Sequence, residues 1–287
     1  MAADGYAHPE VLVETDWVAQ HLNDEKVKIV EVDVDTTMYD TGHIAGAVGW
    51  NWERDTQDTL RRDLLSKPAY EDLLSRSGIA NSSTVVFYGD SNNWFAAYAF
   101  WMLKYYGHSK VRLMNGGRKK WVDEHRPLTI ERPSVTRTSY KGCHADAAVR
   151  ARLTFVEAGL GQPDRALVDV RSPKEFTGEL FAPENRPQEG AQRSGHIPGA
   201  HNIPWGLAVQ DDGTFKPADS LRQLYEAQGV TADKDVIAYC RIGERSSHTW
   251  FVLKYLLGYP KVLNYDGSWT EWGSAVGVPI EKPFHAG

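Results

Sequence analysis

Short apolar runs alternate with amphipathic segments along the whole chain. Runs of four or five residues rich in Val and Ile are typical of buried strands, and the amphipathic segments between them are typical of helices. In the first half this pattern predicts strands at 28–32, 47–51, 84–88 and 111–114, and helices at 15–21, 69–77, 95–106 and 118–124. In the second half it predicts strands at 166–170, 200–203, 235–239 and 262–265, and helices at 154–160, 220–227 and 246–257. Such alternation predicts an α/β fold with an open, mainly parallel sheet flanked by helices in each half.

The second half of the chain repeats the first. Segment 235–272 aligns with segment 84–121, and the motif GHIPGA at 195–200 aligns with GHIAGA at 42–47. A repeat this long indicates duplicated domains rather than a solenoid. Between the copies, the chain is poorly periodic and contains Pro133. We therefore expect an N-terminal domain at 9–130, a linker at 131–152 and a C-terminal domain at 153–287.

The two copies differ in one loop. In the second copy Cys240 ends a predicted strand, and the loop CRIGER at 240–245 leads into the next helix. In the first copy the aligned loop, GDSNN at 89–93, has neither a thiol nor an arginine. The N–H groups of a helix N-terminus and two arginines would stabilise a thiolate, which is the reactive form of cysteine. The loop predicts that Cys240 is a nucleophile with a lowered pKa; an inert buried cysteine is the alternative.

Composition and charge argue against several classes of function, among them binding of nucleic acids, membranes and metals. A net charge of -6 without a basic patch argues against a nucleic-acid partner. The sequence has no apolar run of ~18 residues and no signal-peptide pattern, so we expect no membrane association. Two cysteines in 287 residues are typical of a reducing compartment, and we expect a cytoplasmic protein. No zinc, P-loop or dinucleotide motif is present, so no metal or other cofactor is expected, and a monomer is compatible with the sequence.

These repeated motifs carry a family resemblance. The doubled GHIxGA motif, the doubled Asp/Asn-Gly turn before a Trp-containing helix and the single cysteine loop resemble the tandem-domain sulfurtransferases of the rhodanese superfamily. The resemblance covers almost the whole chain and implies two tandem rhodanese-like domains, of which only the C-terminal one is catalytic. It also implies a sulfur relay. The Cys240 thiolate attacks a small anionic sulfur donor such as thiosulfate, a persulfide forms, and a thiol or cyanide acceptor removes the sulfur.

Several residues near Cys240 are candidates for binding the substrate. We expect the N–H groups of the loop, that of Gly243 included, and the Ser246 hydroxyl to bind the anionic sulfur. Arg241 and Arg245 would bind the donor. For either arginine the alternative is an ion pair with an acidic residue. The supporting residues are Asp169, Arg171, Glu175, Ile242 and Glu244.

Two positions depart from the pattern that the resemblance implies. Ile242 stands where thiosulfate enzymes of the family carry a lysine, and Glu175 stands where they carry an arginine. Both changes reduce the positive charge available to an anionic donor.

Three alternative functions are compatible with parts of this pattern. The 3-mercaptopyruvate branch of the family has small residues after the cysteine, whereas Arg241 follows here. Related phosphatases and arsenate reductases have a Cys-x5-Arg loop, one residue longer than the loop from Cys240 to Arg245. A non-catalytic interaction module would not require a charged cysteine loop in one copy only. Thiosulfate is therefore the expected donor.

Overall fold

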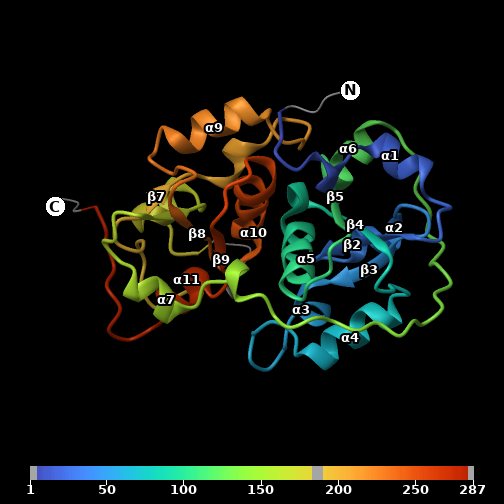
Figure 1. Ribbon diagram of the computed structural model, residues 1–287, viewed down its shortest axis with the longest axis horizontal. Coiled ribbons are helices and arrows are strands. Elements are labelled where there is room, and N and C mark those ends of the chain that lie inside the picture. The colour runs from blue at the N-terminus through green and yellow to red at the C-terminus, as the bar shows by residue number, and fades with distance from the viewer. Residues whose placement is uncertain (1–4, 183–189, 284–287) are drawn as a thin grey trace. The chain divides into compact units, whose positions relative to one another are not determined.

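The computed structural model describes residues 5–182 and 190–283 of the chain (Figure 1). Its contacts divide the chain into two compact units. The N-terminal unit consists of His8–Asp146 and Gln210–Phe215, and the C-terminal unit consists of Met1–Ala7, Ala147–Val209 and Lys216–Gly287. Each unit contains one sheet flanked by helices, so the expected α/β architecture is confirmed.

The N-terminal unit is built on a five-stranded parallel sheet with the order β1-β5-β4-β2-β3. Helix α5 packs against β2, β4 and β5. The strands are β1 (Leu12–Val13), β2 (Val27–Asp33), β3 (Val48–Asn51), β4 (Thr84–Tyr88) and β5 (Val111–Met114). The helices are α1 (Thr15–Gln20), α2 (Thr37–Thr41), α3 (Trp52–Asp55), α4 (Lys67–Arg76), α5 (Trp94–Tyr105) and α6 (Gly117–Asp123). Short 3-10 helices cover Pro9–Val11 and Ser91–Asn93.

The C-terminal unit is built on a four-stranded parallel sheet with the order β7-β6-β8-β9. The strands are β6 (Arg165–Asp169), β7 (His201–Asn202), β8 (Asp235–Tyr239) and β9 (Val262–Tyr265). The helices are α7 (Leu153–Ala158), α8 (Pro173–Thr177), α9 (Ala218–Glu226), α10 (Glu244–Phe251) and α11 (Ser268–Trp272). A π-helical turn, Val252–Leu256, continues α10, and 3-10 helices cover Ala147–Val149 and Trp205–Ala208.

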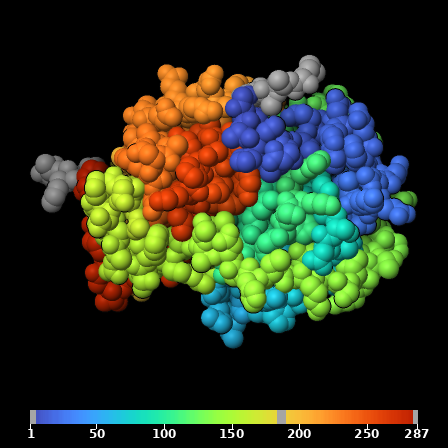
Figure 2. Space-filling model, in the orientation of Figure 1, coloured from blue at the N-terminus to red at the C-terminus, as the bar shows by residue number. Residues whose placement is uncertain are grey.

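The surface helix α9 illustrates how the sequence pattern becomes structure. Its buried residues Ala218, Leu221 and Tyr225 recur at the spacing of one helical face. The opposite face forms part of the molecular surface, coloured orange in Figure 2. Burial of this apolar face, rather than the intrinsic propensity of nine residues, therefore holds the helix in place.

The expected domain boundaries at 130 and 152 remain a prediction, since the units do not follow a single division of the chain. The whole stretch His8–Asp146 belongs to the N-terminal unit. Within the expected linker, Tyr140 is buried, its hydroxyl lies 2.9 Å from Nδ1 of His108, and its N–H donates to the Ser75 hydroxyl. This part of the expected linker therefore packs as a component of the N-terminal unit.

Candidate active site

The loop after β8 carries Cys240, whose side chain is completely buried. Gly243 adopts a left-handed conformation with a φ of 101°, which favours glycine, and it directly precedes α10. A Cβ atom at this position would lie 2.8 Å from Cβ of Asp266, so the loop packs closely against the turn before α11. The first turn of α11 anchors the loop in return, because the N–H groups of Trp269 and Thr270 donate to the carbonyl oxygens of Cys240 and Arg241.

The sulfur atom of Cys240 is surrounded by hydrogen-bonding groups. The N–H of Gly243 donates to Sγ at 3.2 Å, and the hydroxyl of Ser246 lies 3.5 Å from Sγ. The thiol itself donates to Oε2 of Glu244 at 3.2 Å. The structure therefore brings three of the predicted site residues, Gly243, Glu244 and Ser246, into contact with the sulfur.

Ser268 is a site residue that the sequence reasoning missed. Its hydroxyl accepts the N–H of Cys240 at 3.0 Å, and its backbone has a φ of 53°, which is uncommon outside glycine. The aligned residue of the first copy, Gly117, has a φ of 57°. The repeated Asp/Asn-Gly turn could therefore have predicted a left-handed backbone conformation at Ser268.

The predicted direction of the Cys240 pKa is wrong for the resting protein. Burial raises the pKa of the thiol, and the carboxylate of Glu244 raises it further. Arg245 and Ser246 act in the opposite direction without reversing the shift. The resting cysteine is therefore a thiol that donates to Glu244.

Both arginines of the loop pair with buried glutamates, which is the alternative considered for them above. Nε of Arg241 lies 2.5 Å from Oε1 of Glu175, and Nη1 of Arg245 lies 3.2 Å from Oε2 of the same carboxylate. Nε of Arg245 also lies 3.2 Å from Oε1 of Glu244. Burial acts to raise the pKa of Glu175, but the charges of Arg245 and Arg241 outweigh it and lower this pKa to about 2. Binding of a donor by the arginines stays a prediction.

Glu175 reaches the loop because α8 holds it there. Ser172 and Glu175 form a capping box, in which the Ser172 hydroxyl accepts the N–H of Glu175 and the carboxylate accepts the N–H of Ser172. Pro173 occupies the first turn of α8, where it is tolerated. A helix of only five residues has too little periodicity to be predicted from its apolar pattern.

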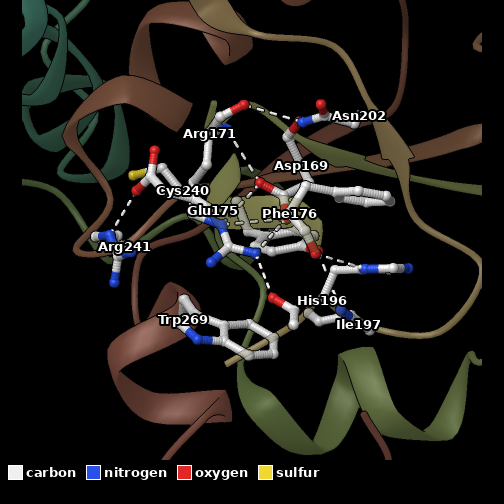
Figure 3. A network of polar contacts seen from close by, with 12 residues as sticks. Asp169, Arg171, Glu175, Phe176, His196, Ile197, Asn202, Cys240, Arg241 and Trp269 are labelled. Atoms are coloured by element: carbon white, nitrogen blue, oxygen red, sulfur yellow. Dashed lines mark hydrogen bonds and ion pairs between the residues drawn. The ribbon is translucent and has the colours of Figure 1, made fainter. Parts of the chain in front are cut away.

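Asp169 and Arg171 form a separate buried ion pair at the end of β6. Nη2 of Arg171 lies 2.6 Å from Oδ2 of Asp169 and 2.8 Å from the carbonyl oxygen of Gly195. The guanidinium group stacks over the ring of Trp269, and its Cζ atom lies 4.5 Å from the ring centroid (Figure 3). These contacts tie the GHIPGA loop and α11 to the sheet. Their supporting role is therefore to hold the elements around the cysteine loop.

The other predicted supporting residue, Ile242, is buried within the loop with an exposed fraction of 9%. Within residues 5–182 and 190–283, no group of three or more His, Cys, Asp or Glu side chains is arranged to hold a metal ion. No helix in that same part of the chain has the length and apolar character needed to cross a membrane.

The chain is similar to one protein family and to several known proteins. Residues 14–124 and 153–275 each match the family described as Rhodanese-like domain. The chain is 60% identical over 285 residues to the sulfur carrier protein TtuD of Thermus thermophilus, covering 97% of this chain and 99% of the relative. It is 56% identical over 278 residues to a Saccharopolyspora erythraea protein named "Putative thiosulfate sulfurtransferase", covering 97% and 98%.

Solved structures show the same fold. The structure of YnjE superposes with a TM-score of 0.85 at 25% identity, covering 98% of this chain and 70% of that one. An anaerobic ergothioneine biosynthesis enzyme from Chlorobium limicola superposes with a TM-score of 0.85 at 21% identity, covering 97% and 72%. Because both halves of the sequence match one family and relatives align over nearly their full length, this chain belongs to the rhodanese family and is a sulfurtransferase.

Proposed function

We propose that the protein transfers sulfane sulfur from thiosulfate to a thiol or cyanide acceptor through a persulfide on Cys240. The observation that carries the proposal is the sulfur of Cys240, held at the end of β8 by the N–H of Gly243 at 3.2 Å with the Ser246 hydroxyl 3.5 Å away. Such donors stabilise an anionic sulfur in a site that excludes water. Relatives whose name includes thiosulfate sulfurtransferase support thiosulfate as the donor.

The reaction would proceed in two half-reactions. The sulfur of Cys240 attacks the outer sulfur of thiosulfate, the bond between the two sulfur atoms of thiosulfate breaks, and sulfite leaves with the bonding electron pair. A thiolate or cyanide then attacks the terminal sulfur of the persulfide and restores Cys240. This is covalent catalysis by a cysteine nucleophile and has ping-pong kinetics.

The test is the mass of the intact protein before and after incubation with thiosulfate. Incubation with thiosulfate should add one sulfur atom to the intact protein, and cyanide should remove it. Cys240→Ser should abolish the gain, because the nucleophile is lost. Cys143→Ser should keep it, because Cys143 is an exposed residue of the N-terminal unit. Loss of the gain in a folded Cys143→Ser protein would contradict the assignment of Cys240 as the acceptor.

A less charged donor is the second candidate, and the pairing of both loop arginines with Glu175 favours it. An organic persulfide would place less negative charge beside these ion pairs than thiosulfate does. The relative named sulfur carrier protein supports transfer between proteins or thiols. Comparing thiosulfate, an organic persulfide and 3-mercaptopyruvate in the mass assay separates these donors. A phosphatase or arsenate reductase would show no gain of sulfur.

A further inference from the structure

Five ionisable side chains form one buried chain of contacts at the cysteine loop. Arg241 contacts Glu175, Glu175 contacts Arg245, Arg245 contacts Glu244, and Glu244 accepts the hydrogen bond of the Cys240 thiol. Figure 3 shows three of these five side chains together, Glu175, Arg241 and Cys240. All five residues are buried. Water therefore contributes little to stabilising any net charge that the group acquires.

This buried group is electrically neutral while Cys240 remains a thiol. Two guanidinium groups balance two carboxylates, so loss of the thiol proton to solvent would leave one uncompensated negative charge. The raised pKa of the Cys240 thiol agrees with this charge balance. A persulfide anion on Cys240 would create the same excess of negative charge, and an anionic donor would add to it.

We infer that Glu244 takes the proton of Cys240 when the persulfide forms and holds it until the sulfur is passed on. The geometry supports this, because the thiol already donates to Oε2 of Glu244 at 3.2 Å. The N–H of Gly243, at 3.2 Å, can only donate to the sulfur. Arg245 keeps the carboxyl group oriented through its contact with Oε1 at 3.2 Å. The inference rests on the proposed function, because it requires a persulfide on Cys240.

Atoms and electrons balance in both half-reactions when Glu244 takes up this proton. The S–H bond of Cys240 breaks and an O–H bond forms on Glu244 as the sulfur attacks the donor. The sulfur–sulfur bond to Cys240 forms, and sulfite leaves with the electron pair of the broken bond. When the acceptor removes the terminal sulfur, the electron pair of the Cys240 sulfur–sulfur bond returns to Sγ. The proton then moves back from Glu244 to Sγ.

Other charged groups near the loop do not supply this proton acceptor. Asp266 packs against Gly243, but both of its carboxylate oxygens accept from Arg150 at 2.7 Å. From α8, Glu175 faces Arg241 and Arg245, and its pKa of about 2 opposes protonation. Glu244 is therefore the carboxylate placed to accept from the sulfur.

Infrared difference spectra of the full-length protein test the inference. Sulfuration by thiosulfate should produce the carbonyl stretch of a protonated carboxyl group, and cyanide should remove it. In Glu244→Gln this band should be absent at equal sulfur content, measured as intact mass, because an amide cannot take up the proton. Sulfuration of this variant should also be slower, since the thiol proton has lost its acceptor. In the same variant the pH midpoint of Cys240 alkylation by iodoacetamide should fall by about one unit or more, since a neighbouring negative charge is lost.

Controls separate the failure of this inference from failure of the proposed function. Glu157→Gln, at an exposed position of α7, should keep both the band and the alkylation midpoint of the wild-type protein. If Glu244→Gln fails to fold, Glu244→Asp should shift the band. A wild-type protein that gains sulfur without producing the band would overturn the proton-holding role. An unchanged alkylation midpoint in Glu244→Gln would also overturn it. A wild-type protein that gains no sulfur from any donor would instead contradict the proposed function.

Discussion

At the scale of single residues, Glu175 changes the net charge around the cysteine loop. Its carboxylate lies 2.5 Å from Nε of Arg241 and 3.2 Å from Nη1 of Arg245. The loop alone carries two arginines and one glutamate, but the folded site adds the charge of a residue from α8. The positive field that the loop sequence indicates is therefore largely cancelled in the folded protein.

Glu175→Gln should improve the use of thiosulfate. Removing one buried negative charge should raise kcat/KM for thiosulfate about fivefold, mainly through KM, if the gain is ~1 kcal/mol. Added salt should change this gain only slightly, because Glu175 is buried and screening acts mainly on exposed charges. The variant should also lose about 3 kcal/mol of unfolding free energy, because two buried arginines lose their shared partner. Steady-state kinetics and urea unfolding measure the two effects.

A neutral organic trisulfide is the control donor for Glu175→Gln. The substitution also changes the charge beside Cys240, so kcat/KM for thiosulfate is compared with kcat/KM for this uncharged donor. The ratio isolates the attraction of the anion from any change in the nucleophile. A ratio equal to that of the wild-type protein at low salt would show that this loop does not attract the donor anion.

At the scale of elements, both units pair a buried carboxylate of a sheet strand with an arginine, but the two arginines do not occupy aligned positions. In the C-terminal unit Asp169 at the end of β6 pairs with Arg171, which stacks on Trp269 of α11. In the N-terminal unit Glu31 of β2 pairs at 2.8 Å with Arg118, the residue of α6 that aligns with Trp269. A buried carboxylate of the aligned strands β2 and β6 is thus paired with an arginine in both units, with the arginine supplied by a different part of the chain in each.

Gly89→Cys should not create a second reactive site. A Cβ atom at position 89 would lie 2.4 Å from the carbonyl oxygen of Val32 and 2.9 Å from Oδ1 of Asp33. The N-terminal loop has therefore lost the space for a cysteine as well as the thiol. We expect this substitution to lower the unfolding free energy by about 2–4 kcal/mol. Intact mass after thiosulfate treatment should still show one added sulfur atom, and a second one would contradict the packing argument.

Asp33→Asn should stabilise the protein at alkaline pH. Burial, followed by the charge of Asp90, raises the pKa of Asp33 from 3.8 to about 9, and its Oδ2 is among the buried described atoms without a hydrogen-bond partner. Between these pH values the folded state keeps a proton that the unfolded chain has lost. The stability from this group is therefore full below pH ~4 and is lost as the pH rises toward about 9.

The asparagine removes this loss, which grows by up to about 1.4 kcal/mol per pH unit between the two pKa values. The gain over the wild-type protein should therefore be larger near pH ~8.5 than near pH ~5, by several kcal/mol. Urea unfolding at the two pH values measures the difference. Asp164→Asn, at an exposed position, is the matched control and should show no such pH dependence. An equal gain for Asp33→Asn at both pH values would mean that the proton on Asp33 is not responsible.

At the scale of the whole molecule, the chain passes from one unit to the other several times. The segment Gln210–Phe215 lies in the second half of the sequence but belongs to the N-terminal unit. The N–H of Phe215 donates to Oδ1 of Asn115 at 3.0 Å, and Gly213 packs against Asn92 and Gly116. The loop of the N-terminal unit that aligns with the cysteine loop thus contacts this segment. Separating the halves at a single point would therefore disrupt both units.

Asn115→Ala should loosen the segment Gln210–Phe215. The substitution leaves the buried N–H of Phe215 without its acceptor, which should cost about 1–3 kcal/mol of unfolding free energy. Limited proteolysis should then cleave within the segment faster than in the wild-type protein. Asn23→Ala removes an exposed asparagine of the same unit and should change neither measurement appreciably. Unchanged proteolysis in Asn115→Ala would show that this hydrogen bond does not hold the segment.

The sequence by itself determined the repeated α/β architecture and the presence of the cysteine loop in one copy only. Strands Thr84–Tyr88 and Asp235–Tyr239 were predicted with their observed bounds, because short apolar runs bounded by polar residues are a local signal. The contacts of Cys240 with Gly243 and Ser246 were predictable for the same reason, since these residues share one loop.

Only the tertiary structure decided the electrostatics of the site. Glu175 comes from the five-residue helix α8, far from Cys240 in sequence, and its pairing with both arginines depends on how the loops pack at the ends of the strands. The direction of the Cys240 pKa follows from burial and from the orientation of Glu244. Burial and distance are properties of the folded chain as a whole. A loop sequence can therefore indicate a candidate nucleophile without determining its protonation state.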